Sequence, residues 1–163
     1  DSLSAGPEME LIIDKLKELI DAGLNFDEIC AKINAYKEKT HLNFALESLD
    51  NLAKNGRISP AVAKVAKMLK IRIIGRPDDG KLTPIGKARG AKKTISYLIK
   101  DMEEHGFSNG RVIIAHILNK EGANNLKQTI LDKHPEASFE IREARGLCTY
   151  YAQKGGLMVG YEA

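Results

Sequence analysis

The chain has 163 residues, of which 43% are hydrophobic and 29% charged, values typical of a globular domain. Its 25 basic and 22 acidic residues leave a net charge of only +3, which argues against a nucleic-acid-binding protein. No apolar run is long enough to span a bilayer, and the two cysteines, Cys30 and Cys148, have neither metal-ligand nor disulfide-framework spacing. We therefore expect one domain, or one domain with a piece of another, in a reducing, cytoplasmic setting.

Helical and strand periodicities alternate along the chain. Apolar residues recur at helical spacing in some segments, and apolar and polar residues alternate in others. In chain order these patterns predict helix 6–22, a helix starting at 25, strand 40–46, short helix 49–55, helix 60–69, strand 71–74, turn 77–80, strand 81–85, helix 87–105, strand 111–117, helix 121–133, strand 138–144 and strand 157–161.

The most informative segment is Leu49–Ser59, which reads LDNLAKNGRIS. Asn55-Gly56 predicts the end of one helix, and Ser59-Pro60 predicts the start of the next, with serine as the cap. Arg57 is thus fixed between two helix ends and is suited to meet a carboxylate or phosphate with its planar guanidinium. The alternative is a surface arginine that pairs with a helix carboxylate.

The strands indicate the architecture. Several are apolar on one face and polar on the other, as in a sheet covered on one side. Only residues 112–115 form the continuous apolar run expected of a fully buried parallel strand. The pattern therefore predicts an α/β fold, a two-layer sandwich with a mixed sheet.

The order of short motifs resembles the DegV family, bacterial proteins that bind a single fatty acid and include the fatty-acid-carrying subunits of bacterial fatty acid kinase. The resemblance covers essentially the whole chain and depends on the order and spacing of the motifs together. They are Asp1-Ser2, Leu49-Asp50-Asn51-Leu52, Asn55-Gly56-Arg57-Ile58-Ser59, Asp79-Gly80-Lys81-Leu82, Lys87-Ala88-Arg89, Val112-Ile113-Ile114-Ala115-His116 and a glycine-rich terminal strand.

The resemblance implies that a lobe is missing. Members of the family have two lobes with the fatty acid between them, and the N-terminal lobe supplies hydroxyls that hold the carboxylate. Residues 1–23 would be a remnant of that lobe, ending with its last helix. Residues 24–163 would be the C-terminal α/β lobe, with a mixed, largely antiparallel sheet of about six strands covered by helices. The abrupt start at Asp1 without Met agrees with a processed or truncated product.

The resemblance also implies roles for three polar residues. Arg57 matches the family's arginine that faces the ligand head group. Gln153 stands where the family usually has a histidine that approaches the head group, and an amide can donate a hydrogen bond but cannot titrate near neutral pH. Arg89 matches an arginine that faces the kinase partner, with an exposed arginine at a helix start as the equally weighted alternative.

The apolar strand residues are core positions first and a possible wall for the acyl chain second. They are Leu42, Phe44, Ile73, Ile113 and Val159. No catalytic motif, metal-ligand set or cofactor loop is present. We therefore expect a lipid-binding protein, not an enzyme, whose ligand is a long-chain fatty acid that it presents to a fatty acid kinase-like protein. The alternative is a protein-interaction module that docks a kinase-like partner and binds no ligand of its own.

Overall fold

The structure, a computed structural model, describes all 163 residues. Its six strands form one sheet in the order β3-β2-β1-β6-β4-β5. Neighbouring strands are antiparallel except β4 and β5, which are parallel. The predicted mixed sheet is therefore confirmed. The strands are β1 (Thr40–Leu46), β2 (Arg72–Asp78), β3 (Lys81–Ala88), β4 (Arg111–His116), β5 (Ser138–Glu143) and β6 (Leu157–Glu162).

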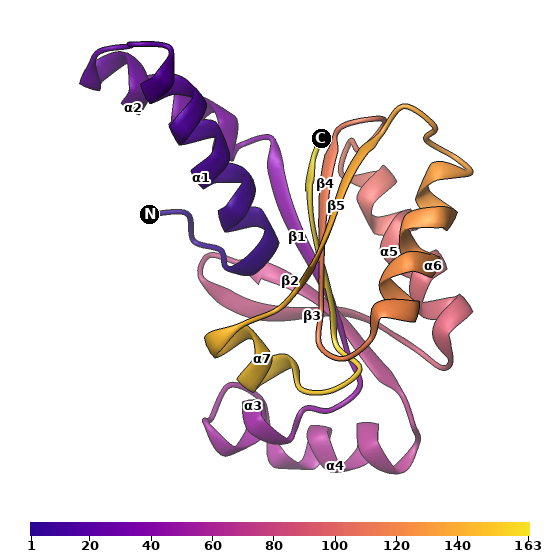
Figure 1. Cartoon of the computed structure of the whole chain (residues 1–163). Coiled ribbons are helices and arrows are strands. Elements are labelled where there is room, and N and C mark those ends of the chain that lie inside the picture. Colours follow the sequence, from indigo (N-terminus) through magenta and orange to yellow (C-terminus); the bar gives the residue numbers. More distant parts are fainter.

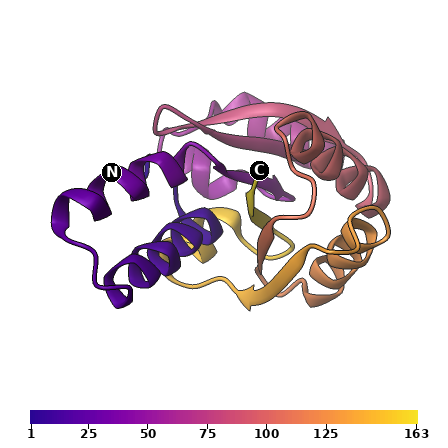
Figure 2. The same ribbon diagram turned by 90° about the horizontal axis from the view of Figure 1, so that it is seen from above.

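Helices cover the sheet, as predicted, but on both of its faces and not on one, because the helix of residues 6–21, which was expected to belong to another lobe, packs on the second face. Helices α5 and α6 lie on one side of it, and α1 and α2 lie on the other, while α3, α4 and α7 gather at one end (Figures 1 and 2). None of these helices is both long and apolar enough to cross a membrane. They are α1 (Gly6–Asp21), α2 (Phe26–Lys37), α3 (Asp50–Lys54), α4 (Pro60–Met68), α5 (Ala91–Glu104), α6 (Lys120–Leu131) and α7 (Gly146–Ala152).

The two faces of the sheet belong to two separate hydrophobic clusters, because successive strand residues point to opposite faces. On the face of α5 and α6, Ala45 and Val159 pack with the helix residue Leu98 in a cluster of 17 buried residues. On the other face, Phe44 and Met158 belong to a cluster of 11 buried residues. β1 and β6 thus contribute alternate side chains to each core.

Helix α1 packs directly on the sheet, chiefly on β6, β4 and β1. Its residues Leu11, Ile12 and Leu19 are buried. Gly160 allows the close approach, since a Cβ at this position would lie 2.5 Å from the Glu8 nitrogen. Residues 1–23 are therefore part of the same packed body as the rest of the chain, and their origin in a separate lobe stays a prediction.

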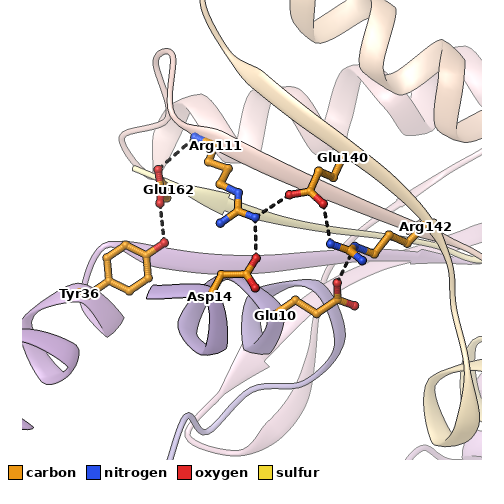
Figure 3. A network of polar contacts seen from close by, with 7 residues as sticks. All are labelled: Glu10, Asp14, Tyr36, Arg111, Glu140, Arg142 and Glu162. Atoms are coloured by element: carbon orange, nitrogen blue, oxygen red, sulfur yellow. Dashed lines mark hydrogen bonds and ion pairs between the residues drawn. The ribbon is translucent and has the colours of Figure 1, made fainter. Parts of the chain in front are cut away.

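Ion pairs connect α1 with strands β4 and β5 of the sheet (Figure 3). The Arg111 guanidinium on β4 contacts Asp14 on α1 and Glu140 on β5, each at 2.5 Å. Arg142 joins the same network through Glu140 and, at 2.9 Å, through Glu10 on α1. These carboxylates raise the pKa of Arg111 further above its usual range. The network holds α1 across the face of the sheet that also carries the Phe44 cluster.

The structure differs from the prediction at two helices. The helix expected from Lys87 begins only at Ala91, because Lys87 and Ala88 pair with β2 as the end of β3. Gly90, with φ +82°, then turns the chain into α5. Helix α7 was not predicted, since its seven residues are too few to show a helical period.

Substitution of Arg111 tests the network. We expect Arg111→Met to lower the free energy of unfolding by about 2 kcal/mol, because two charge-assisted contacts from a mostly buried guanidinium are lost. Lys100→Met, which removes only an exposed pair with Glu104, is the matched control and should change stability by less than about 0.5 kcal/mol. Urea titration measures both, and equal losses in the two variants would contradict a special role for Arg111.

A polar cluster lies between β1, β2 and α5. The His41 ring stands 6.0 Å from that of His105 and 5.3 Å from that of Tyr161, centroid to centroid. Arg76 and Asp101 complete the cluster, with a separation of 3.7 Å. Burial lowers the pKa of His41, and the nearby His105 and Arg76 lower it further, against the opposing effect of Asp101.

The lowered pKa of His41 predicts a pH dependence of stability. Below about pH 6.5 the unfolded chain binds the proton of this histidine more readily than the folded chain, so stability is lost as the pH falls. We expect the unfolding free energy of the wild type to drop relative to that of His41→Phe between pH 8 and pH 5.5. Parallel pH profiles in chemical denaturation would show that the histidine contributes nothing.

Candidate functional site

Arg57 is held by two helix ends, as the sequence predicts. At the end of α3 the Arg57 nitrogen donates to the Leu52 carbonyl (2.8 Å) and the Gly56 nitrogen to the Ala53 carbonyl (3.1 Å), the bonding pattern of a Schellman motif. Gly56 has the positive φ, +67°, that this motif requires. Two residues later the Ser59 hydroxyl accepts from the Val62 nitrogen (3.4 Å) at the start of α4.

Arg57 lines two hollows on the face of the sheet opposite α5 and α6. A small, enclosed hollow of about 60 Å³ runs under it, and a wider one of about 480 Å³ lies at its mouth. A third, of about 290 Å³, continues along the β2–β3 hairpin to the N-terminal segment. Leu82 lines all three, so we treat them as one feature, the Arg57 groove. Its apolar lining comprises Leu3, Ala5, Leu42, Phe44, Leu49, Leu52, Ile58, Ile73, Pro77, Leu82 and Pro84.

The charges in the Arg57 groove are mostly unpaired cations. Arg57 is exposed and takes part in none of the ion pairs of the structure, and the same is true of Lys81, across the groove on the hairpin. An apolar trough with free cations at its mouth fits a ligand with an anionic head and an aliphatic tail. No group of three or more His, Cys, Asp or Glu side chains is arranged to hold a metal ion.

The structure brings together three of the five predicted wall residues. Leu42, Phe44 and Ile73 all line the groove. Ile113 is fully buried and pairs with Gly160, the residue on which α1 rests, so it lies beneath α1. Val159 lies on the opposite face, in the cluster with α5 and α6, because the side chain next to Met158 must point the other way.

Gln153 lies beside Ser48 and does not line the groove. The Ser48 hydroxyl donates to its Oε1 atom (3.1 Å), and its Nε2 atom is buried with no acceptor. The backbone of Gln153, with φ +54° and ψ 178°, occupies a region that normally only glycine adopts. The structure therefore does not bring Gln153 and Arg57 together, and a head-group role for Gln153 requires its side chain to turn outward.

Arg89 occupies an exposed loop between β3 and α5, two residues before the helix. It takes part in no ion pair and lines a separate cavity with Lys67, Lys70 and Arg72. The sequence did not predict this grouping, since its members come from α4, the start of β2 and the end of β3.

Three further residues line the Arg57 groove and were not predicted from the sequence. Lys81 and Leu82 belong to the β2–β3 hairpin, where the Pro77–Gly80 turn signal was recognised but its direction in space was not. Tyr151 reaches the mouth of the groove from α7, which is held beside α3 by a hydrogen bond from the Asn51 amide to the Tyr150 carbonyl (2.7 Å). The motif Asp79-Gly80-Lys81-Leu82, one of those that carry the family resemblance, is the sequence signal for Lys81 and Leu82.

Comparison with known proteins gives matches along the whole chain. The model of the DegV family, described as an uncharacterised protein family, matches residues 1–163. A DegV domain-containing protein of Streptococcus pyogenes serotype M3 is 44% identical over 163 residues, which cover 99% of this chain and 58% of the relative. A DegV domain-containing protein of Streptococcus pneumoniae strain R6 is 42% identical with the same coverage. The chain thus spans about 58% of the length of these curated relatives.

Solved structures of two similar proteins contain fatty acids. A DegV family protein of Eubacterium eligens loaded with heptadecanoic acid superimposes with a TM-score of 0.95 at 38% identity, over 100% of this chain and 59% of that one. The Fatty Acid Kinase (Fak) B3 protein of Streptococcus pneumoniae, loaded with linoleic acid, gives a TM-score of 0.95 at 42% identity, over 99% of this chain and 58% of that one. With its full-length family match and its shared fold, the chain belongs to the DegV family.

Proposed function

We propose that this chain is the C-terminal lobe of a two-lobed protein that binds one long-chain fatty acid, and that the Arg57 groove is its share of the binding site. The observation that carries the proposal is the unpaired Arg57 at the mouth of a groove lined by Leu42, Phe44 and Ile73. Support comes from the fatty acids bound to the Eubacterium eligens and Streptococcus pneumoniae relatives, which are longer than this chain.

The energetics of burial favour a second lobe. A sixteen-carbon acid has about fourteen methylenes, and burying each is worth about 0.8 kcal/mol, so complete burial is worth roughly 11 kcal/mol before the costs of binding. The groove is open to solvent along the hairpin, where Leu82 is 43% exposed. A ligand in it would therefore stay partly in water. The isolated 163-residue chain should bind fatty acid weakly or not at all.

The proposed protein is a carrier and not an enzyme. The groove is lined mainly by cations and apolar side chains. Its other polar groups include the Asp1 carboxylate and the Ser4 hydroxyl, which donates to Glu8, and no histidine or cysteine lines it. This carrier would present its bound fatty acid to a fatty acid kinase-like protein in the cytoplasm. The name of the Streptococcus pneumoniae relative supports the kinase partnership.

A second candidate is an interaction module that docks a kinase-like partner without binding a ligand of its own. It is favoured by Arg89, which is exposed and without an ion-pair partner on the side of the molecule where α4 and α5 meet the ends of β2 and β3. The first candidate requires the Arg57 groove for fatty-acid binding, and the second does not. Separate variants of Arg57 and Arg89 therefore distinguish them.

Arg57→Met should weaken fatty-acid binding by the longer, two-lobed protein about tenfold or more, because a charge-assisted contact with the carboxylate is lost. Calorimetry or displacement of a fluorescent fatty acid measures the change. Arg145→Met, which removes an equally exposed arginine outside the groove, should leave the affinity unchanged. Equal affinity of wild type and Arg57→Met would refute the role of Arg57, and nanomolar binding by the 163-residue chain alone would refute the need for a second lobe.

Arg89→Ala should abolish co-purification of the two-lobed protein with its kinase-like partner, because the exposed cation at the docking face is removed. Fatty-acid affinity, measured on the same sample, should not change, since Arg89 does not line the Arg57 groove. If co-purification and fatty-acid affinity are both unchanged, Arg89 has no docking role. If both are lost, Arg89 does not act independently of the Arg57 groove.

A further inference from the structure

A second cavity lies away from the Arg57 groove and shares no lining residue with it. It measures about 450 Å³. Four of its residues are cationic, one is acidic, and Ile71 is the only hydrophobic residue among them. The complete lining is Glu47, Lys67, Lys70, Ile71, Arg72, Arg89 and Gly90.

The internal ion pairs of the cavity leave two cations uncompensated. Arg72 is paired with Glu47, and Lys67 is paired with Asp50 at 2.9 Å. Lys70 and Arg89 take part in no ion pair. The surplus of two positive charges matches the charge of about −1.5 to −2 that a phosphate monoester carries at neutral pH.

Lys70 stands in a backbone conformation that the other helix ends of the same type give to glycine. Helix α4 ends in a Schellman motif, in which the Ile71 nitrogen donates to the Ala66 carbonyl (3.0 Å) and the Lys70 nitrogen to the Lys67 carbonyl (3.2 Å). Lys70 therefore adopts φ +52°, which an L-residue with a side chain adopts at a cost.

Three other helices end with the same pair of hydrogen bonds. The residues at the corresponding position are Gly23 after α1, Gly56 after α3 and Gly106 after α5. Lysine is thus the exception, at the one helix end that opens into the cationic cavity. A strained residue with a long cationic side chain at such a place indicates a function for the side chain.

We infer that this cavity binds the phosphate group of a small phosphorylated compound, held by Lys70 and Arg89. The Arg89 guanidinium suits two phosphate oxygens at once, and Lys70 supplies a second, point-like positive charge in the same cavity. Arg72, which is paired with Glu47, lines the same cavity with a side chain that is 23% exposed. The site goes beyond the proposed fatty-acid function and does not depend on it.

Titration of the 163-residue chain with inorganic phosphate tests the inference. The readout is the amide ¹H–¹⁵N NMR shifts of Ile71 and Gly90, at constant ionic strength with chloride as the competing anion. Saturable shifts confined to the cavity are expected. Shifts that do not saturate, or that spread over all surface lysines, would overturn the site.

Variants of the two uncompensated cations make the test specific. Arg89→Met and Lys70→Gly should each weaken phosphate binding about tenfold. Lys70→Gly should also raise the melting temperature by about 2–4 °C, because glycine relieves the strained φ. This opposite effect on stability excludes unfolding as the cause of lost binding. Lys64→Ala is the matched control, since it removes an exposed lysine of the same helix outside the cavity.

The outcome for Lys64→Ala decides between a site and a diffuse charge effect. Binding unchanged within about twofold supports a built site, and a loss equal to that of Lys70→Gly would contradict it. Glycerol 3-phosphate and adenosine monophosphate, titrated in the same way, separate a lipid head group from a nucleotide as the source of the phosphate. If glycerol 3-phosphate and adenosine monophosphate both bind more weakly than inorganic phosphate, the site binds the free anion and the inferred phosphorylated compound is overturned.

Discussion

Along β1, Leu42, Phe44 and Leu46 point to one face of the sheet, while Asn43 and Ala45 point to the other. The face of Ala45 is sealed by α5 and α6. The face of Phe44 is covered only in part, by α1 and by the short helices at one end, and the Arg57 groove occupies what they leave open. A shift of β1 by one residue would exchange the two faces and remove the groove, so its register is the constraint on which the proposed site depends.

Helix ends then place the charges around this apolar floor. The same hydrogen-bond pattern closes α3 and α4, with Gly56 in one case and Lys70 in the other. After α3 the motif delivers Arg57 to the groove, and after α4 it delivers Lys70 to the cationic cavity. Short helices are thus used here as rigid supports for single cations, which would lose more entropy if they were carried by a flexible loop.

Much of the fold could be predicted from local patterns. The six strands, the helix ends at Asn55-Gly56 and Ser59-Pro60 and the capped start of α2 depend on nearby residues, and the structure confirms them. The wall of the groove could be predicted only in part. Val159 was misplaced because the register of β6 against β1 is a long-range property, which pairs Met158 with Phe44. The cationic cavity was missed for the same reason, since Lys70 and Arg89 approach each other only in the folded chain.

The most direct test of the proposed groove locates the acyl chain itself. Uniformly ¹³C-labelled sixteen-carbon fatty acid would be bound to the two-lobed protein, and isotope-filtered nuclear Overhauser effects recorded to its side chains. We expect contacts from the methylenes to the Phe44 ring and to the Leu42 and Leu82 methyl groups, and none to Val159. Contacts to Val159, or none to Phe44, would contradict the proposed groove.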